Sequence, residues 1–593
     1  MAARDSLRTD AHKWTSLATR VTNGEMPPKG SPAPPIDQRV QFTEWVESAL
    51  RAEACAGGLT AGPSPIRRLN RDEYAATIRD LLDIHLDIGG NLPADGAGGE
   101  GFDNAAETLF LSPLHAEKYL DTAKFALDFA AKEYKSRAKI LIAEPGPGTS
   151  PEQAARAILA GFLPRAFRRP VAGAEVAPYL SLYHAAREQN QTFEEAVFFA
   201  LRAALVSPHF LFRAEGPAAS ATARPASYAL ASRLSYFLWG SMPDELIFDI
   251  AAEGRLQDPA VLRALIPRML RNDRSLAFAN RFVEQWLRTR ELGGDKAPDA
   301  MLFPEFTADE ELRSDIRYQP VLFFRELLVR DISLLNLIDS THTIGTSNLA
   351  RHYGVKFDYR QAGTKQPQWV PVPDHSDRGG LLGMAAILAV SSHPYRSSPV
   401  LRGAWILDSM LGTPPPPPPP NVPPLEEAKE GAPAASVRER LTAHRANAAC
   451  AACHDRIDPL GFALENYDPV GAWRNYDSGK PVDNNGRLVD GAEFSGPAEL
   501  KATLMKRRDV FIRNLASKML GYALGRGLTL SDACTVDDIV AQVREQNYRA
   551  QALVEAIVLS APFLRPPEKG APEPGQLAEE IKPEQLKKAR TSR

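Results

Sequence analysis

Residues 192–206 read TFEEAVFFALRAALV, and this stretch carries both a start signal and a body for a helix. Thr192 and Glu195 have the spacing of a capping box, in which the threonine side chain accepts from the helix N-terminus and the glutamate reaches back. The apolar run that follows is stopped by SPHF at residues 207–210. The stretch therefore predicts a helix with a defined first turn.

Signals of the same kind recur on both sides of this stretch. Asn70 with Glu73 has the capping-box spacing, and so does Thr307 with Glu310. Ser227 is a candidate cap for a further helix that runs through YALASRLSYFLWG. Helix signals thus dominate, and we expect a mainly α protein.

Two further patterns refine the expected helices. Pro320 lies midway along the helix that starts near Thr307, which predicts a kink or a break there. Near the C-terminus, apolar residues recur at three and four positions and predict one apolar helix face; they are Phe511, Leu515, Met519 and Tyr522. One short β-hairpin is expected in GKPVDNNGRLVDGAEFSG, turned at Asn485-Gly486.

The length of 593 residues indicates a multi-domain helical protein. Three Gly- and Pro-rich segments predict linkers: GPGTSP at 146–151, GPAASATARP at 216–225 and RQAGTKQPQWVPVPDH at 360–375. The predicted domains are 64–145, 150–215, 225–358, 375–498 and 500–566, with an N-terminal segment 1–55 and a disordered tail 567–593. Pro414 to Pro420 is a stiff polyproline rod, either a spacer or a docking rod for an aromatic groove.

Composition and charge exclude some classes of function. Hydrophobic residues make up 44% and charged residues 24%, which is typical of a globular protein. The net charge of −3 and the lack of a basic block predict no nucleic-acid partner. The longest apolar run, LLGMAAILAV at 381–390, is shorter than the roughly 20 residues that span a bilayer, so no transmembrane segment is expected. The first residues contain no apolar signal-peptide region.

The chemistry-bearing motif is CAACH at residues 450–454, which holds two of the four cysteines. Three chemistries use C-x-x-C: zinc binding, thiol redox exchange and covalent haem attachment. A zinc site normally has a second ligand pair at short spacing, and Cys55 and Cys534 are lone and far apart. A redox dithiol is expected after a buried strand, whereas the preceding residues are charged and helix-prone.

Haem attachment uses every residue of the motif. Cys450 and Cys453 would bind the porphyrin covalently, and His454 would be the proximal iron ligand. We therefore favour one haem c in the chain, with the dithiol and zinc readings as alternatives. In the oxidising compartment that haem c implies, Cys55 and Cys534 are expected to be either free or paired with each other.

Long motifs along the chain carry a family resemblance. SSHPYRSSPVLRGAWILDSMLGTPPPPPPPNVPPL followed by CAACHDRIDPLGFALENYDPVGAWR resembles the haem-motif domain of the planctomycete-type multi-domain cytochrome c family. Five other blocks match the same architecture in order: IRRLNRDEYAATIRDLL, ILAGFLPRAFRRPV with LVSPHFLFRAE, RLSYFLWGSMPDELI, NLARHYGV and FIRNLASKMLGYALGRGL. The resemblance implies a small c-type cytochrome-like domain among helical domains without established chemistry.

The chain departs from the family pattern at one place. It reads RSDIRYQPVLFFREL at 313–327, where relatives tend to carry a Glu-Thr pair before the aromatic residues, and Pro320 stands in that place. The resemblance also implies that Met26, in a G-x-MPP stretch, is the orphan axial ligand of a missing N-terminal haem domain, so that residues 1–55 are its remnant. A loop methionine beside a proline turn is the alternative.

The sixth ligand of the iron stays open in the sequence. His393, His444, Met505 and Met519 are candidates by position, although Met519 also fits the apolar helix face described above. Arg396 and Arg402 are candidate partners of the haem propionates, and ordinary surface salt bridges are the alternative.

These features support three hypotheses of function. The first is an exported c-type haem protein that transfers single electrons to a redox partner protein or a small electron carrier, with the helical domains as scaffold. The second is a haem-assisted oxidoreductase or polymer-processing enzyme, and the third is an envelope interaction protein. Haem c is attached after export, so the expected place is the periplasm or cell envelope, although no signal peptide is visible.

Overall fold

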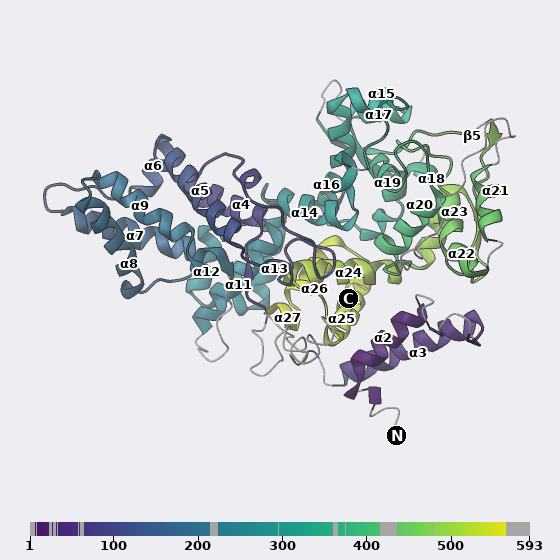
Figure 1. Cartoon of the computed structure of the whole chain (residues 1–593), viewed down its shortest axis with the longest axis horizontal. Helices are drawn as coiled ribbons and strands as arrows, with labels where there is room; N and C mark the ends of the chain where they lie inside the picture. The colour runs from purple at the N-terminus through teal and green to yellow at the C-terminus, as the bar shows by residue number, and fades with distance from the viewer. Residues whose placement is uncertain are drawn as a thin grey trace, which may run out of the picture. The chain divides into compact units, whose positions relative to one another are not determined.

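A computed structural model describes residues 6–564, apart from 8, 23–25, 28–30, 33, 57–58, 60–64, 214–222, 295, 360–365, 374, 416–435, 446–447 and 478. The described chain is mainly α, as predicted (Figure 1). It divides into two compact units, each built from separate segments of sequence. One unit contains 1–58, 275–519 and 536–556, and the other contains 59–274, 520–535 and 557–593. We call them the 275–519 unit and the 59–274 unit. The finer domain boundaries expected from the sequence stay predictions.

The 59–274 unit is a helical assembly with one large apolar core. Helices α7, α8 and α9 pack on one another, and α5 packs on α9. Its elements are β1 (Arg67–Arg68), α4 (Arg71–Leu82), α5 (Pro113–Ala130), α6 (Tyr134–Ile140), α7 (Pro151–Phe167), α8 (Gly173–Glu188), α9 (Phe193–Leu205), α10 (Pro208–Leu211), β2 (Phe212–Arg213), α11 (Ala223–Leu238), α12 (Glu245–Ala252), α13 (Pro259–Arg271) and α27 (Ala561–Leu564).

Two predicted capping boxes are confirmed in this unit. Thr192 caps α9, and its partner Glu195 closes the box. Asn70 and Glu73 do the same at α4. Glu73 also takes both terminal nitrogens of Arg67, at 2.7 and 2.8 Å, in a buried pair. The cap of α4 is therefore part of a buried ionic cluster, which fixes the start of the helix more firmly than an exposed box would.

The 275–519 unit is centred on α14 (Ser275–Trp286) and α16 (Glu310–Arg330), which pack through Phe282 and Phe324 with ring centroids 5.6 Å apart. Its other helices are α2 (Ala11–Thr22), α3 (Ile36–Cys55), α15 (Pro304–Ala308), α17 (Ser347–Tyr353), α18 (His375–Arg378), α19 (Ala385–Val390), α20 (Pro399–Trp405), α21 (Val437–Arg445), α22 (Ala448–Phe462) and α23 (Gly496–Lys506). Three more helices cross the division between the units: α24 (Arg508–Leu524), α25 (Ala533–Glu545) and α26 (Ala550–Val558).

The N-terminal segment forms a helix pair. Helices α2 and α3 pack on each other around four buried residues, which are Leu7, Ala18, Val46 and Leu50. Met26 lies between the two helices in sequence and is partly buried, and its backbone N–H donates to the Arg20 carbonyl. Residues 1–55 contain no C-x-x-C-H motif, and the role of Met26 as an orphan ligand stays a prediction.

The structure does not place the turn of the predicted β-hairpin at Asn485-Gly486. The segment forms two small antiparallel pairs, β5 (Tyr476–Asp477) with β6 (Lys480–Pro481) and β7 (Asn485–Arg487) with β8 (Glu493–Ser495). Gly486 lies inside β7, opposite Phe494, and a Cβ there would stand 2.3 Å from the Phe494 ring. Glycine is needed at this position for close packing rather than for a turn.

Three helix starts or stops also differ from expectation. Thr307 is inside the short helix α15, and Asp309 caps α16 by accepting from the Leu312 N–H. Helix α16 continues through Pro320 without the predicted break, because that face is packed in the core. Ser227 lies inside α11, which begins at Ala223. At α16 the carboxylate of Asp309 is the cap in place of Thr307, and α11 starts before Ser227.

Three other predictions concern the apolar face near the C-terminus, the linkers and the polyproline rod. The apolar face of α24 is confirmed, with Phe511, Leu515, Met519 and Tyr522 all buried. The linker expected at 360–375 contains strand β4 (Gln368–Pro371), which pairs with β3 (His342–Gly345). Most of the polyproline rod, most of the linker at 216–225 and the tail 567–593 lie outside the described residues.

Candidate functional site around helix α22

The C-x-x-C-H motif lies on helix α22 of the 275–519 unit. Positions 450, 453 and 454 are spaced by three and four residues, so they occupy one face of the helix. Cys453 and His454 are partly buried, whereas the side chain of Cys450 lies outside the description. The backbone thus presents both cysteine positions and the histidine position on the same side, as covalent attachment to one porphyrin requires.

The imidazole of His454 is held by a buried carboxylate. Its Nδ1 lies 2.9 Å from Oδ1 of Asp458, one helical turn later, and the Asp458 side chain has no exposed surface. An ionised carboxylate only accepts hydrogen bonds, which places the imidazole proton on Nδ1. The lone pair of Nε2 is then the one available to a metal, and the ring orientation is set by Asp458.

Helix α22 is fixed in place by a close crossing with α20. A Cβ on Gly461 would stand 1.8 Å from the Pro399 carbonyl oxygen, and a Cβ on Gly403 would stand 1.9 Å from that of Ile457. Neither distance is physically possible, so each helix needs a glycine where it meets the backbone of the other. The two glycines lie in the family-like motifs RSSPVLRGAW and DRIDPLGFAL.

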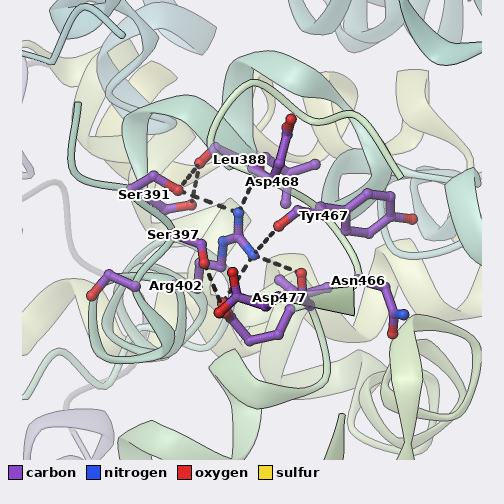
Figure 2. Close-up of polar contacts among 12 residues, drawn as sticks. Leu388, Ser391, Ser397, Arg402, Asn466, Tyr467, Asp468 and Asp477 are labelled. Carbon is purple, nitrogen blue, oxygen red and sulfur yellow. Dashed lines mark hydrogen bonds and ion pairs between the residues drawn. The ribbon is translucent and has the colours of Figure 1, made fainter. Parts of the chain in front are cut away.

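Arg402 on α20 anchors the chain that leaves α22 (Figure 2). Its side chain has no exposed surface. Nη1 donates to the carbonyls of Leu464 (2.6 Å) and Tyr467 (2.8 Å), and Nη2 donates to that of Asp468 (2.9 Å). Burial lowers the pKa of the Arg402 guanidinium, and the Glu465 carboxylate, 3.1 Å from Nη1, opposes that shift.

Glu465 connects this arginine to a second one. Its Oε2 accepts from Ser397 Oγ at 2.7 Å and from Arg474 Nη2 at 3.1 Å, and Arg474 also reaches Asp477 at 2.9 Å. Figure 2 shows Tyr467 and Asp468 beside the Arg402 guanidinium, which donates to both of their carbonyls. The charges are therefore paired and the terminal nitrogens of Arg402 are used, while its Nε is buried without an acceptor among the described residues.

The propionate role predicted for Arg402 would require this network to open. Both of its terminal nitrogens are engaged by the protein itself, including Ser392 Oγ at 3.3 Å. Arg396 is less buried and lies over the Tyr395 ring at 5.7 Å. For both arginines the propionate contact stays a prediction, with Arg396 the more accessible of the two.

The candidate sixth ligands lie on separate elements. His393 is in the turn before α20, where its N–H donates to the Arg396 carbonyl, and burial together with Arg396 and Lys296 lowers its imidazole pKa. Met505 lies on α23 and is partly buried, and Met519 lies on α24 and is fully buried in its apolar face. His444 lies on α21, and its side chain is outside the description. No candidate is distinguished from the others by these positions.

Sequence reasoning missed a second group of residues beside this segment. His352 Nε2 lies 2.7 Å from the Val470 carbonyl, and Arg378 Nη2 donates to the Gly471 carbonyl at 3.0 Å. The Arg378 guanidinium lies over the ring of Tyr353 at 4.3 Å and over that of Tyr467 at 5.2 Å. His352 and Tyr353 lie in the motif NLARHYGV, whereas Arg378 is outside it and no sequence pattern links the three.

Two cysteines lie outside the C-x-x-C-H motif. Cys55 and Cys534 are both disulfide-bonded. Within the described residues, no cluster of three or more His, Cys, Asp or Glu side chains is arranged to hold a metal ion. None of the described helices combines the length and the apolar character needed to cross a bilayer.

Comparison with known proteins identifies domains along most of the chain. Five regions match families described as proteins of unknown function: DUF1587 at 67–132, DUF1595 at 154–215, DUF1592 at 226–355, DUF1588 at 378–477 and DUF1585 at 490–563. The α20 and α22 site lies entirely within the DUF1588 region. Searches of curated proteins and of solved structures found no match. The chain therefore carries the five-domain set that accompanies planctomycete-type cytochromes c.

Proposed function

We propose that this chain is a c-type haem protein that transfers single electrons. The observation that supports it best is the hydrogen bond from His454 Nδ1 to the buried Asp458 carboxylate, on a helix where two cysteine positions share the face of the histidine. That arrangement supplies two thioether positions and one oriented nitrogen ligand. The five cytochrome-associated domains add independent support.

The residues present fit a covalently bound haem. Such a haem supplies a one-electron iron couple whose potential depends on its ligands and on hydrogen bonding around them. Asp458 orients the His454 ring through Nδ1, which leaves Nε2 as the nitrogen that would hold the iron, and it adds negative charge behind the imidazole. The α20 crossing and the Arg402 network hold both ends of this geometry rigid.

The electron-transfer proposal has consequences for place and partners. Haem c is attached outside the cytoplasm, so we propose the periplasm or cell envelope as the site of action. A redox protein or a small electron carrier would exchange electrons with the haem, and the helical domains would act as scaffold or docking surface.

The first experiment asks whether haem is attached. The full chain is produced with an export signal in a bacterium with a working cytochrome c maturation system, and the denatured protein is extracted with acid-acetone. We expect the colour to stay with the protein, and Cys450→Ala with Cys453→Ala to remove it. A colourless wild-type protein would overturn the proposal.

A second measurement tests the role of His454 and Asp458. Asp458→Asn keeps the shape of the side chain and removes its charge, so the iron(III) form loses stabilisation. We expect the midpoint potential to rise by about 60 mV, the equivalent of a tenfold change in relative stability for a one-electron couple. Asp455→Asn is the matched control, because it removes the same charge from the same helix at the position that follows His454. Equal potentials in all three proteins would contradict the assignment of Asp458.

A further inference from the structure

The 275–519 unit contains a cavity of about 210 Å³ that the haem proposal does not use. Its apolar wall is formed by Val355, Phe357, Val372 and Met384, and Trp473 also lines it. The polar side chains that line it are Gln319, Thr343, Tyr353, Asp377 and Arg378. An apolar pocket with a few convergent polar groups is the usual form of a small-molecule site.

Arg378 is the unusual member of this wall. Its residue is only 9% exposed, yet within the described part of the chain it forms no ion pair. It donates to two neutral carbonyls, from Nη1 to Gly383 at 3.4 Å and from Nη2 to Gly471 at 3.0 Å. A guanidinium has five N–H groups, so three have no acceptor among the residues that the structure describes. Buried charges are normally paired, and this one meets only neutral groups.

The guanidinium is held in one orientation by two rings. Tyr353 and Tyr467 both lie within cation–π distance, at 4.3 and 5.2 Å. Burial raises the pKa of both tyrosines, so neither hydroxyl supplies a negative charge near neutral pH. The Tyr467 hydroxyl donates to the Asp377 carbonyl at 2.8 Å, which locks that ring.

Three other polar residues of the cavity wall, Tyr353, Gln319 and Thr343, are held by hydrogen bonds within the protein before any ligand binds. The Tyr353 hydroxyl accepts from the Ala385 N–H at 3.0 Å and donates to Gln319 Oε1 at 2.6 Å. Gln319 Nε2 in turn donates to the Ile344 carbonyl at 3.0 Å and to Thr343 Oγ1 at 3.2 Å. A pre-organised wall lowers the entropic cost of binding. Gln319 is neutral, so it brings no carboxylate to the wall that Arg378 also lines.

We propose that this cavity binds a small organic carboxylate, with the carboxylate on Arg378 and the apolar body against Phe357, Val372 and Met384. Carboxylates match the planar guanidinium fork and form charge-assisted hydrogen bonds with it. Pockets for drug-sized ligands hold roughly 300–1,000 Å³, so this smaller cavity suits a ligand with about one ring.

Asp377 is a negatively charged residue of the cavity wall and would repel the carboxylate of such a ligand. It lines the same cavity and is partly exposed, whereas Arg378 is buried. Coulomb attraction is stronger for the buried charge because solvent screens it less. Asp377→Asn should therefore tighten carboxylate binding.

The test uses benzoate as probe and the full chain with haem attached. Binding is measured by titration calorimetry for benzoate and for benzamide, its neutral isostere. We expect benzoate to bind at least about tenfold more tightly than benzamide, and Arg378→Met to weaken benzoate by at least about tenfold. Arg351→Met, the same change at an exposed arginine of this unit, should leave binding unchanged. Absent benzoate binding, equal affinity for both probes or an unaffected Arg378→Met protein would overturn the proposal.

Two more variants separate binding from folding and from haem. Val372→Phe fills the cavity and keeps Arg378, so it should abolish benzoate binding with unchanged thermal unfolding; retained binding would overturn the site. The protein with Cys450→Ala and Cys453→Ala carries no thioether site and should bind benzoate as the haem-attached chain does. Binding confined to this haem-free form would show that a haem carboxylate occupies Arg378, which would overturn the proposal of a separate ligand.

Discussion

Two buried arginines of the same unit show opposite solutions to the burial of a charge. Arg402 has no exposed surface, pairs with Glu465 and gives its terminal nitrogens to three carbonyls and a hydroxyl. Arg378 is 9% exposed, meets two carbonyls and two rings, and lines a cavity. The terminal nitrogens of the first arginine are engaged by the protein, whereas the second retains donors with no acceptor among the described residues, which a ligand can use.

Both arginines act on the same short segment. Arg402 holds the carbonyls of Leu464, Tyr467 and Asp468, His352 meets that of Val470, and Arg378 holds that of Gly471. This segment follows helix α22 directly, so the C-x-x-C-H helix and the cavity share one support. The difference between the arginines predicts which substitutions affect folding and which affect binding.

The largest effect is expected for Arg402→Met. The substitution removes a fully buried cation and leaves Glu465 with fewer partners, so the free energy of unfolding should fall by about 3–5 kcal/mol. Urea unfolding followed by circular dichroism measures the change. Arg351→Met, at an exposed arginine, should cost less than about 0.5 kcal/mol. A loss below about 1 kcal/mol for Arg402→Met would remove the contrast between the two arginines.

Gly461→Ala should follow in size. Its Cβ would stand 1.8 Å from the Pro399 carbonyl oxygen, so α20 and α22 must move apart. We expect a loss of about 1–3 kcal/mol in the free energy of unfolding, although alanine is the better helix former. Gly173→Ala is the control, because nothing lies within 4 Å of a Cβ at that position. Equal free energies of unfolding for Gly461→Ala and Gly173→Ala would show that the α20–α22 crossing does not stabilise the site.

Arg378→Met should separate binding from stability. It removes two hydrogen bonds to neutral carbonyls and also removes the cost of burying an unpaired charge, so the unfolding free energy should change by less than about 2 kcal/mol. Benzoate binding should nevertheless be lost. A change as large as that of Arg402→Met would mean that both arginines are structural.

The smallest effect concerns His352 and depends on pH. Burial lowers the pKa of its imidazole, and the hydrogen bond to Val470 opposes that shift only in part. The unfolded chain then binds the proton more readily, with a histidine pKa of about 6.5, so stability is lost as the pH falls below that value. His352→Gln should flatten the decline in urea midpoint between about pH 7 and pH 5. An unchanged pH dependence of the urea midpoint would show that His352 does not stabilise the segment after α22.

Local signals predicted local structure well where nothing competed with them. The boxes at Asn70 and Thr192 formed because the cap and its partner lie in one turn. Thr307 failed because Asp309, two residues later, offers a carboxylate to the same helix. Gly486 is required by the Phe494 ring across the strand pair, a contact that no turn rule contains.

The sequence by itself determined the helical class of this protein, the motif at 450–454 and the face on which its positions lie, because helix geometry depends only on spacing. Only the tertiary structure decided what the arginines do. Arg396, Arg402 and Arg378 look alike in sequence, and their roles depend on how many carbonyls and carboxylates surround each guanidinium. Those partners come from residues up to 93 positions away, and the cost of burying a charge makes such partners decisive.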